Sequence, residues 1–239
     1  MSGTQIRATM QRRILVNYRM EPRALAALLP TPFRPAPVHG YGVAGICLIR
    51  LQGIRPAGFP GAVGLSSENA AHRAAVEWDT PDGPVTGVYV ARRDTSSWLT
   101  PLVGGRLFPG FQHPARFRVA EGDGAYEVEV SSRDGQVRIA VAAHLIDEIR
   151  PGSVFTTLDE ASAFFRSGPV GYASTPAAGV FDGLELHTDG WDIQPLRVDH
   201  VTSSFFEDAA RFGDVELDSA FLMTGLDTSW RSLPRLVAA

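Results

Sequence analysis

The sequence predicts an α+β fold that consists mainly of antiparallel β-strands. Nine stretches of the 239-residue chain alternate apolar and polar side chains with the period of two that is typical of strands. Turn sequences such as "TPDGP", "EGDG" and "SRDG" separate several of these stretches, whereas stretches with helical spacing are few and short. Antiparallel sheets of this extent are expected to close or pack over one core.

Turn sequences lie between several of the nine predicted strands. Both "EGDG" and "SRDG" are hairpin turns, so we predict a three-stranded antiparallel meander over residues 115–146. The predicted strands are residues 12–18, 42–51, 72–78, 86–92, 115–121, 125–132, 136–146, 191–198 and 215–223.

Three short helices are predicted between these strands. The segment "EPRALAALLP" has apolar residues at helical spacing and ends at Pro30. In "TLDEASAFFRSG", Thr157 precedes Glu160 by three residues, as in a capping box, and Gly168 ends the helix. The segment "TSSWLTPLVGG" predicts a third helix, which Pro101 interrupts.

Length and composition predict one domain over residues 1–239, because 44% hydrophobic residues suffice for a full core and no linker divides the chain. The net charge is −4, with 22 basic and 26 acidic residues spread along the chain, so nucleic acid is not an expected partner. No segment has the apolar length of a membrane span or of a signal peptide, so we expect no membrane partner and a cytoplasmic protein. The single cysteine, Cys47, lies in an apolar run and is interpreted as a buried structural thiol.

The sequence contains no generic catalytic signature. It has no P-loop, no dinucleotide-binding fingerprint, no Gly-x-Ser-x-Gly elbow and no histidine or cysteine cluster with metal-ligand spacing. We therefore expect neither a metal nor an organic cofactor. The candidate functional residues are polar side chains within otherwise apolar strands and glycine-rich turns.

Three candidates lie in the first third of the chain. Arg19 follows a strand, where its guanidinium can bind a carboxylate, although a surface arginine is the alternative. Glu68 precedes an apolar strand face and is a candidate for acid–base work, with a turn or capping role as the alternative. His72 shares that face with Val76 and Trp78, so it is either a binding residue or a core histidine.

Three further candidates follow. Tyr89, on the strand that precedes the cluster "RRD", can donate a hydrogen bond into a cavity or belong to the core. In "GGRLFPGFQHP", Arg106 offers a fixed cation and His113 can exchange a proton near neutral pH, although a loop position is the alternative for His113.

Two segments resemble the acetoacetate decarboxylase-like superfamily. The segment "YRMEPRALAALLPTPFRP" is similar to the N-terminal signature of that superfamily, and "GGRLFPGFQHP" is similar to its Gly-Arg-Glu turn followed by Pro-Lys-Lys. A weaker match is "WDIQPLRVDHVTSSFF", and the whole chain most resembles the uncharacterised YqjF-like branch over a core of about residues 10–225. The resemblance implies antiparallel sheets closed into a cone-like barrel around a mostly apolar cavity, within a homo-oligomer.

The resemblance also implies site residues and one decisive difference. Arg19, Arg106 and Glu68 match the anion-binding and acidic residues of the decarboxylase site, whereas His113 stands where its Schiff-base lysine would lie. The chain has no lysine at all, because all 22 basic residues are arginine. Imidazole cannot form the protonated imine that acts as electron sink, so Schiff-base decarboxylation is excluded.

Two functions remain open from the sequence. In the first, the protein is a cofactor-independent lyase, hydratase or cyclase that acts on a carbonyl or carboxylate compound, with His113 and Glu68 exchanging protons and Arg19, Arg106, Tyr89 and His72 binding the substrate. In the second, it is a non-catalytic carrier of an apolar acid. A third possibility is a cavity that side chains fill, which would leave only the surface for function.

Overall fold

Strand β1 (Gln5–Met20) is central to the sheet, because it pairs with β12 (Glu216–Val237) on one side and with β3 (Gly42–Pro56) on the other. The computed structural model describes residues 5–60, 64–97, 111–208 and 212–238. The other elements are α1 (Pro22–Ala26), β2 (Arg34–Pro35), β4 (Leu65–Thr80), β5 (Gly83–Thr95), β6 (His113–Gly122), β7 (Ala125–Ser132), β8 (Arg138–Leu145), α3 (Leu158–Ser167), β9 (Val170–Ser174), β10 (Val180–Thr188) and β11 (Gln194–Ser203).

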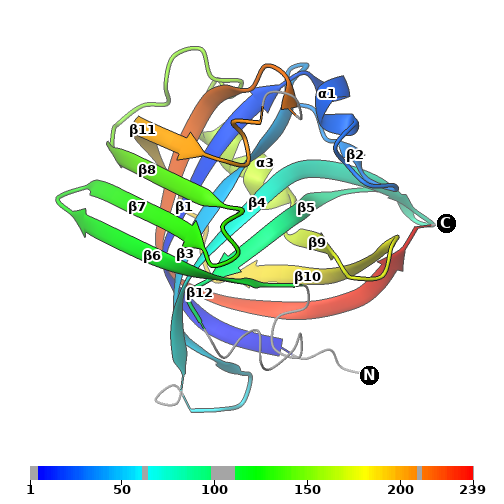
Figure 1. Cartoon of the computed structure of the whole chain (residues 1–239), viewed down its shortest axis with the longest axis horizontal. Helices are drawn as coiled ribbons and strands as arrows, with labels where there is room; N and C mark the ends of the chain where they lie inside the picture. Colours follow the sequence, from blue (N-terminus) through cyan, green and yellow to red (C-terminus); the bar gives the residue numbers. More distant parts are fainter. Residues whose placement is uncertain (1–4, 61–63, 98–110, 209–211, 239) are drawn as a thin grey trace.

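The sheet closes on itself through two pairings, β4 with β5 and β10 with β12. One closed ring runs β12–β1–β3–β4–β5–β9–β10 and returns to β12. A second ring shares β12, β1, β3, β4 and β5 with the first, and it returns from β5 to β12 through β6, β7, β8 and β11. Figure 1 shows β6, β7 and β8 together on one side and β9, β10 and β12 on the other, with β1, β3 and β4 between them. The predicted fold, mainly antiparallel strands that close around a core, is therefore confirmed.

The strands β1, β3 and β4 have a buried core on each face. On β1, Ile14 and Val16 belong to the core beneath β6–β8, whereas Leu15 packs in a second core with Cys47 and Phe221. This alternation follows from the period of two along a strand. The pairing of β1 with β3 shifts register between Met10 and Arg12, and such a bulge changes which residues share a face.

Helix α3 packs against the face of β1, β3 and β12 that carries Leu15 and Phe221. The Thr157 side chain accepts a hydrogen bond from the backbone N–H of Glu160, which satisfies one of the free donors at the helix start. The ring of Phe165 lies 5.8 Å from that of Phe221. Helix α3 therefore fills one part of the β12–β1–β3–β4–β5–β9–β10 ring, and a cluster around Met10, Leu51 and Leu184 fills another.

Each of the nine predicted strands overlaps a strand of the structure, and β6, β7 and β8 form the predicted antiparallel meander. The strands β2, β9 and β10 were not predicted, and for β9 and β10 there is a reason in the sequence. Glycines weaken their strand signal, and Gly183 has a packing reason, because a Cβ atom there would lie 2.6 Å from the ring of Tyr172. The first two predicted helices are confirmed as α1 and α3, whereas most of the third, residues 98–105, lies outside the described residues.

Candidate functional site

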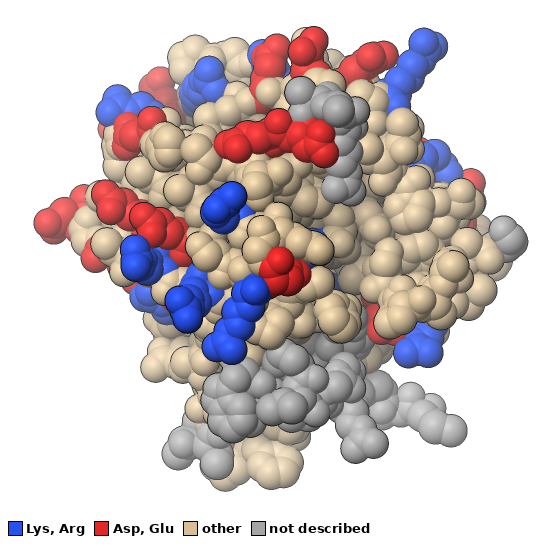
Figure 2. All heavy atoms as spheres, viewed as in Figure 1, with Lys and Arg blue, Asp and Glu red and all other residues tan. Residues whose placement is uncertain are grey.

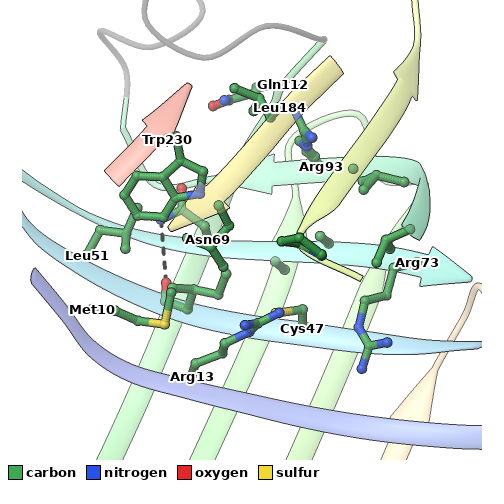
Figure 3. A pocket seen from close by; sticks show the side chains of 18 of the residues that line it. Met10, Arg13, Cys47, Leu51, Asn69, Arg73, Arg93, Gln112, Leu184 and Trp230 are labelled. Atoms are coloured by element: carbon green, nitrogen blue, oxygen red, sulfur yellow. Dashed lines mark hydrogen bonds between the residues drawn. The ribbon is translucent and has the colours of Figure 1, made fainter. Parts of the chain in front are cut away.

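A pocket of about 180 Å³ lies inside the β12–β1–β3–β4–β5–β9–β10 ring, and all of these strands contribute to its lining. Its lining is mostly apolar. Among the apolar residues are Met10, Ile49, Leu51, Val90, Leu184 and Trp230. Figure 3 shows the polar lining residues entering from several strands, with Asn69 near the middle. They are Arg13, Cys47, Asn69, Arg73, Arg93, Asp94 and Gln112.

Arg13 lies on β1 and extends along the pocket wall. Its Nε atom donates a hydrogen bond to Cys47 Sγ at 3.4 Å, and its Nη1 atom lies 3.9 Å from Met223 Sδ. Its guanidinium carbon stands 5.8 Å from the ring centroid of Trp191. Sulfur atoms are weak acceptors, and Arg13 forms no ion pair with a carboxylate among the described residues. The positive charge of Arg13 is therefore only weakly compensated.

Arg73 lies on β4 and is only 6% exposed. Its Nη2 atom donates a hydrogen bond to Asn17 Oδ1 at 2.6 Å, and its guanidinium stands over the ring of Phe165. Burial lowers the pKa of Arg73 to about 10, with Cys47 opposing this shift and repulsion from Arg13 adding to it. Two cations that repel each other therefore line one pocket.

Arg93 lies on β5 and is half-buried. Burial lowers its pKa to about 10, and attraction to Asp182 opposes this shift. Figure 3 shows Arg93 close to Gln112 on one side of the pocket, while Arg13 and Cys47 lie on the opposite side. The pocket therefore carries positive charge on two sides, with Asn69 and mostly apolar residues lining the rest.

The acidic lining residue of the pocket, Asp94, is held by a neighbouring cation. The Asp94 side chain is buried and accepts a hydrogen bond from Arg92 Nη2 at 2.9 Å. Arg92 also binds Asp134, which lies 3.1 Å from His113 Nδ1. Burial alone would raise the pKa of Asp134. Hydrogen bonds from Ser132, the Gln136 N–H and Arg92 outweigh this effect and hold the pKa of Asp134 well below its usual value. The His113 side chain is thus connected to the pocket wall through Asp134, Arg92 and Asp94.

Glu68, the predicted proton-transfer partner of His113, lies in a ring of four alternating charges. It is bound by Arg12 at 2.5 Å and by Arg50 at 2.5 Å, and both arginines also bind Glu121. Arg12 is only 2% exposed. Burial alone would raise the pKa of Glu121. The hydrogen bond from Arg12 and the charges of Arg12 and Arg50 nevertheless hold this pKa below its usual value. The ring does not line the pocket.

His72 and Tyr89 lie on other faces of their strands. The His72 ring is fully buried and stacks on Phe205 at 4.2 Å between centroids, beside Ser203. The Tyr89 hydroxyl forms a hydrogen bond with Ser174 Oγ at 2.9 Å, and its ring packs on Phe33. Neither residue lines the pocket, so their predicted binding roles receive no support from this arrangement.

Arg19 lies at the end of β1, where acidic groups surround it. Its Nη2 atom is 2.6 Å from Glu216 Oε2, its Nη1 atom is 3.8 Å from Asp218 Oδ1, and it donates a hydrogen bond to the Gly152 carbonyl at 2.5 Å. The hydrogen bond with Glu216 raises the pKa of Arg19. Arg19 and His113 share no partner, and the predicted binding residue Arg106 lies outside the described residues.

The structure therefore separates the predicted site residues and brings a different set together. Arg13 and Asn69 were not singled out from the sequence, although an arginine pair inside the apolar stretch "RRILV" is a usable signal. The pocket residues Asn69 and Arg73 are direct neighbours of the predicted residues Glu68 and His72. Because neighbouring residues of a strand point to opposite faces, Glu68 and His72 face away from the pocket that Asn69 and Arg73 line.

The described residues contain no group of three or more histidine, cysteine, aspartate or glutamate side chains arranged to hold a metal ion. No helix among them has the length and apolarity needed to cross a membrane. On the face drawn in Figure 2, acidic side chains and arginines are interspersed, with several acidic side chains along the upper edge.

Solved structures with this architecture are acetoacetate decarboxylase-like. An acetoacetate decarboxylase-like enzyme from Sphingomonas wittichii RW1 has a TM-score of 0.57 at 13% identity, over 100% of this chain and 94% of that one. Acetoacetate decarboxylase from Legionella pneumophila has a TM-score of 0.58 at 15% identity, over 98% and 87%. The enduracididine biosynthesis enzyme MppR, in complex with pyruvate, has a TM-score of 0.59 at 10% identity, over 100% and 91%.

At these identities the similarity establishes the fold, which is that of the acetoacetate decarboxylase-like superfamily. Residues 7–218 match the model of the DUF2071 family, an uncharacterized conserved protein. The chain belongs to that family. None of the curated proteins matches it.

Proposed function

We propose that the pocket binds a small organic carboxylate with an apolar body. One observation carries this proposal: Arg13 and Arg73 line one pocket, repel each other and form no ion pair with a carboxylate among the described residues. Arg73 is buried and Arg13 is half-buried, and a buried cation without an opposite charge is costly, because it has lost water and gained little in return. A bound carboxylate would compensate both charges, and arginine offers the paired N–H donors that suit it.

The rest of the pocket supports an apolar body for the ligand. Leu51, Leu184 and Trp230 provide aliphatic and aromatic surface, and the volume of about 180 Å³ is smaller than the roughly 300–1,000 Å³ of sites for drug-sized ligands. The ligand is therefore a small acid. Pyruvate in complex with MppR is a small acid on the same fold, which is consistent with this class.

A thermal-shift screen of keto acids, enolisable carbonyl compounds and medium-chain carboxylates tests the proposal. A binding acid at about 100 times its dissociation constant should stabilise the protein by about 2.7 kcal/mol. The gain should disappear in Arg13→Gln and persist in the control Arg118→Gln, whose guanidinium is exposed on β6 and lies 3.7 Å from Glu129. Equal stabilisation of both variants, or no stabilisation by any acid, would overturn the proposal.

Acid–base turnover of the bound compound is the second candidate. The contact that favours it is the chain from Asp94 at the pocket wall through Arg92 and Asp134 to His113, because it connects a titratable imidazole to the pocket. His113→Gln should then abolish turnover and leave the ligand's affinity unchanged. If every ligand found in the screen is recovered unchanged with the wild-type protein, the carrier function is favoured instead.

A further inference from the structure

We propose that the ligand is a short-chain dicarboxylate, with one carboxylate bound at Arg13 and Arg73 and the other at Arg93 and Gln112. The inference rests on the proposed function and specifies its ligand class. It follows from the placement of positive charge on two separate sides of one pocket.

The sheet register separates the two sides. Arg13 on β1 and Arg93 on β5 have the strands β3 and β4 between them, because β1 pairs with β3, β3 with β4 and β4 with β5. Neighbouring strands lie about 4.8 Å apart, so the backbones of β1 and β5 are roughly 14 Å apart along this curved wall. Figure 3 shows the Arg93 and Arg13 side chains on opposite sides of the pocket.

The electrostatics of the three arginines agree with two sites rather than one. Repulsion from Arg13 contributes to the lowered pKa of Arg73, so these two charges lie close together. The pKa of Arg93 responds to burial and to Asp182, and neither Arg13 nor Arg73 contributes to it. Together with the position of Arg93 on the opposite side of the pocket from Arg13, this groups Arg13 with Arg73 in one cationic site and assigns Arg93 to a second.

Apart from Asn69, the pocket lining between the two cationic sites is mostly apolar. Leu51, Val90, Leu184 and Trp230 line the pocket there and can contact a methylene chain. The volume of about 180 Å³ limits the length of that chain. A dicarboxylate with few methylene groups therefore fits the pattern of charge, apolar surface and charge better than a long fatty acid.

The two acidic groups nearest to Arg93, Asp94 and Asp182, each have a further arginine partner. Asp94 accepts hydrogen bonds from Arg92, which compensates its charge. Asp182 attracts Arg93 but also accepts a hydrogen bond from Arg235 Nε at 2.8 Å. Gln112 can contribute amide donors on the same side.

Calorimetric titration with matched pairs of acids tests the proposal. Succinate, glutarate and adipate are each compared with the monoacid of equal chain length, namely butyrate, pentanoate and hexanoate. We expect at least one diacid to bind about tenfold or more tightly than its monoacid, because a second charge-assisted contact forms. In Arg93→Gln this preference should fall to about one to two-fold while the monoacid affinity stays the same.

The variants separate failure of this inference from failure of the proposed function. If monoacids and diacids bind the wild type equally, or if Arg93→Gln keeps the preference, the dicarboxylate inference is wrong and carboxylate binding stands. If neither class binds, both fail. Arg93→Lys keeps the positive charge and should keep part of the preference for diacids. Gln112→Leu should reduce this preference, and it provides the test if Arg93→Gln does not fold. Arg118→Gln is the control and should behave as the wild type.

Discussion

The Nε atom of Arg13 donates a hydrogen bond to the Sγ atom of Cys47 over 3.4 Å, so a cation and the single thiol of the chain share one side of the pocket. An anionic thiol reagent should therefore be guided to Cys47. Iodoacetate is anionic and iodoacetamide is neutral, so we compare the rates at which the two reagents alkylate Cys47. We expect the ratio of the iodoacetate rate to the iodoacetamide rate to be at least about tenfold higher in the native chain than in the chain unfolded in urea. Intact-mass spectrometry over time measures both rates.

Two variants make this labelling experiment specific. Arg13→Gln should lower the native ratio toward that of the unfolded chain, because one of the guiding charges is gone. Cys47→Ser should give no product with either reagent. Equal ratios for the native and unfolded wild type would contradict an anion-attracting pocket at Cys47.

Removing one member of the charge ring should destabilise the protein. In Glu68→Gln, the nearly buried guanidinium of Arg12 keeps only Glu121 as a carboxylate partner. We expect the free energy of unfolding in urea to fall by about 3 kcal/mol. The control is Glu129→Gln, which removes an exposed pair with Arg118 and should change the free energy by less than about 0.5 kcal/mol. A stable Glu68→Gln that lost turnover would instead support the predicted catalytic role of Glu68.

Acid should weaken the start of helix α3. The backbone N–H of Thr156, His39 and the Thr156 hydroxyl lower the pKa of Glu160 to about 2. Since this value lies below the roughly 4.3 of an unfolded chain, the stabilisation is complete above about pH 4.3 and is lost as the pH falls toward 2. Glu160→Gln should therefore lose less stability than the wild type when the pH is lowered through this window.

Urea unfolding at several pH values measures this difference. The exposed Glu127, on β7, supplies the control Glu127→Gln, which should follow the wild type. If the stability of Glu160→Gln fell as steeply as that of the wild type, the ionised Glu160 would contribute nothing to the folded state.

The close approach of β1 and β3 should not tolerate a side chain at Gly45. A Cβ atom there would lie 2.2 Å from the carbonyl oxygen of Val16, and a strand backbone cannot move away without loss of pairing. We expect Gly45→Ala to lower the free energy of unfolding by more than about 3 kcal/mol. Gly122→Ala is the control, because a Cβ atom there has no neighbour within 4 Å. Similar unfolding curves for both variants would refute the close contact.

The sequence predicts the strands well because their alternation is clear, but alternation does not say which face lines a pocket. On β4, Glu68 and His72 point to one face and Asn69 and Arg73 to the other. Both faces are covered, one by the core that contains Phe206 and the other by the pocket and α3. Where both faces of a strand are buried, polarity cannot choose between them, so the predicted residues Glu68 and His72 lie one position from the pocket residues Asn69 and Arg73.

The charge partners also could not be read from the sequence. Arg19 matched a family signature, but its partner Glu216 lies 197 positions away and is brought to it only by the pairing of β1 with β12. The same holds for Arg12 and Glu121, which are 109 positions apart. The predicted single domain, homo-oligomer and cytoplasmic location stay predictions.

The pairing of β12 with both β1 and β10 has a consequence for synthesis of the chain. The ribosome delivers Met10 early and Trp230 late, yet both residues line the same pocket. The edge of β1 that β12 covers stays open until Glu216–Val237 has emerged, and an open apolar edge can pair with other nascent chains. Contacts between such distant segments also make closure slow. A ligand therefore cannot assist the early stages of folding, and its stabilising effect begins only once translation has supplied the last strand of the ring.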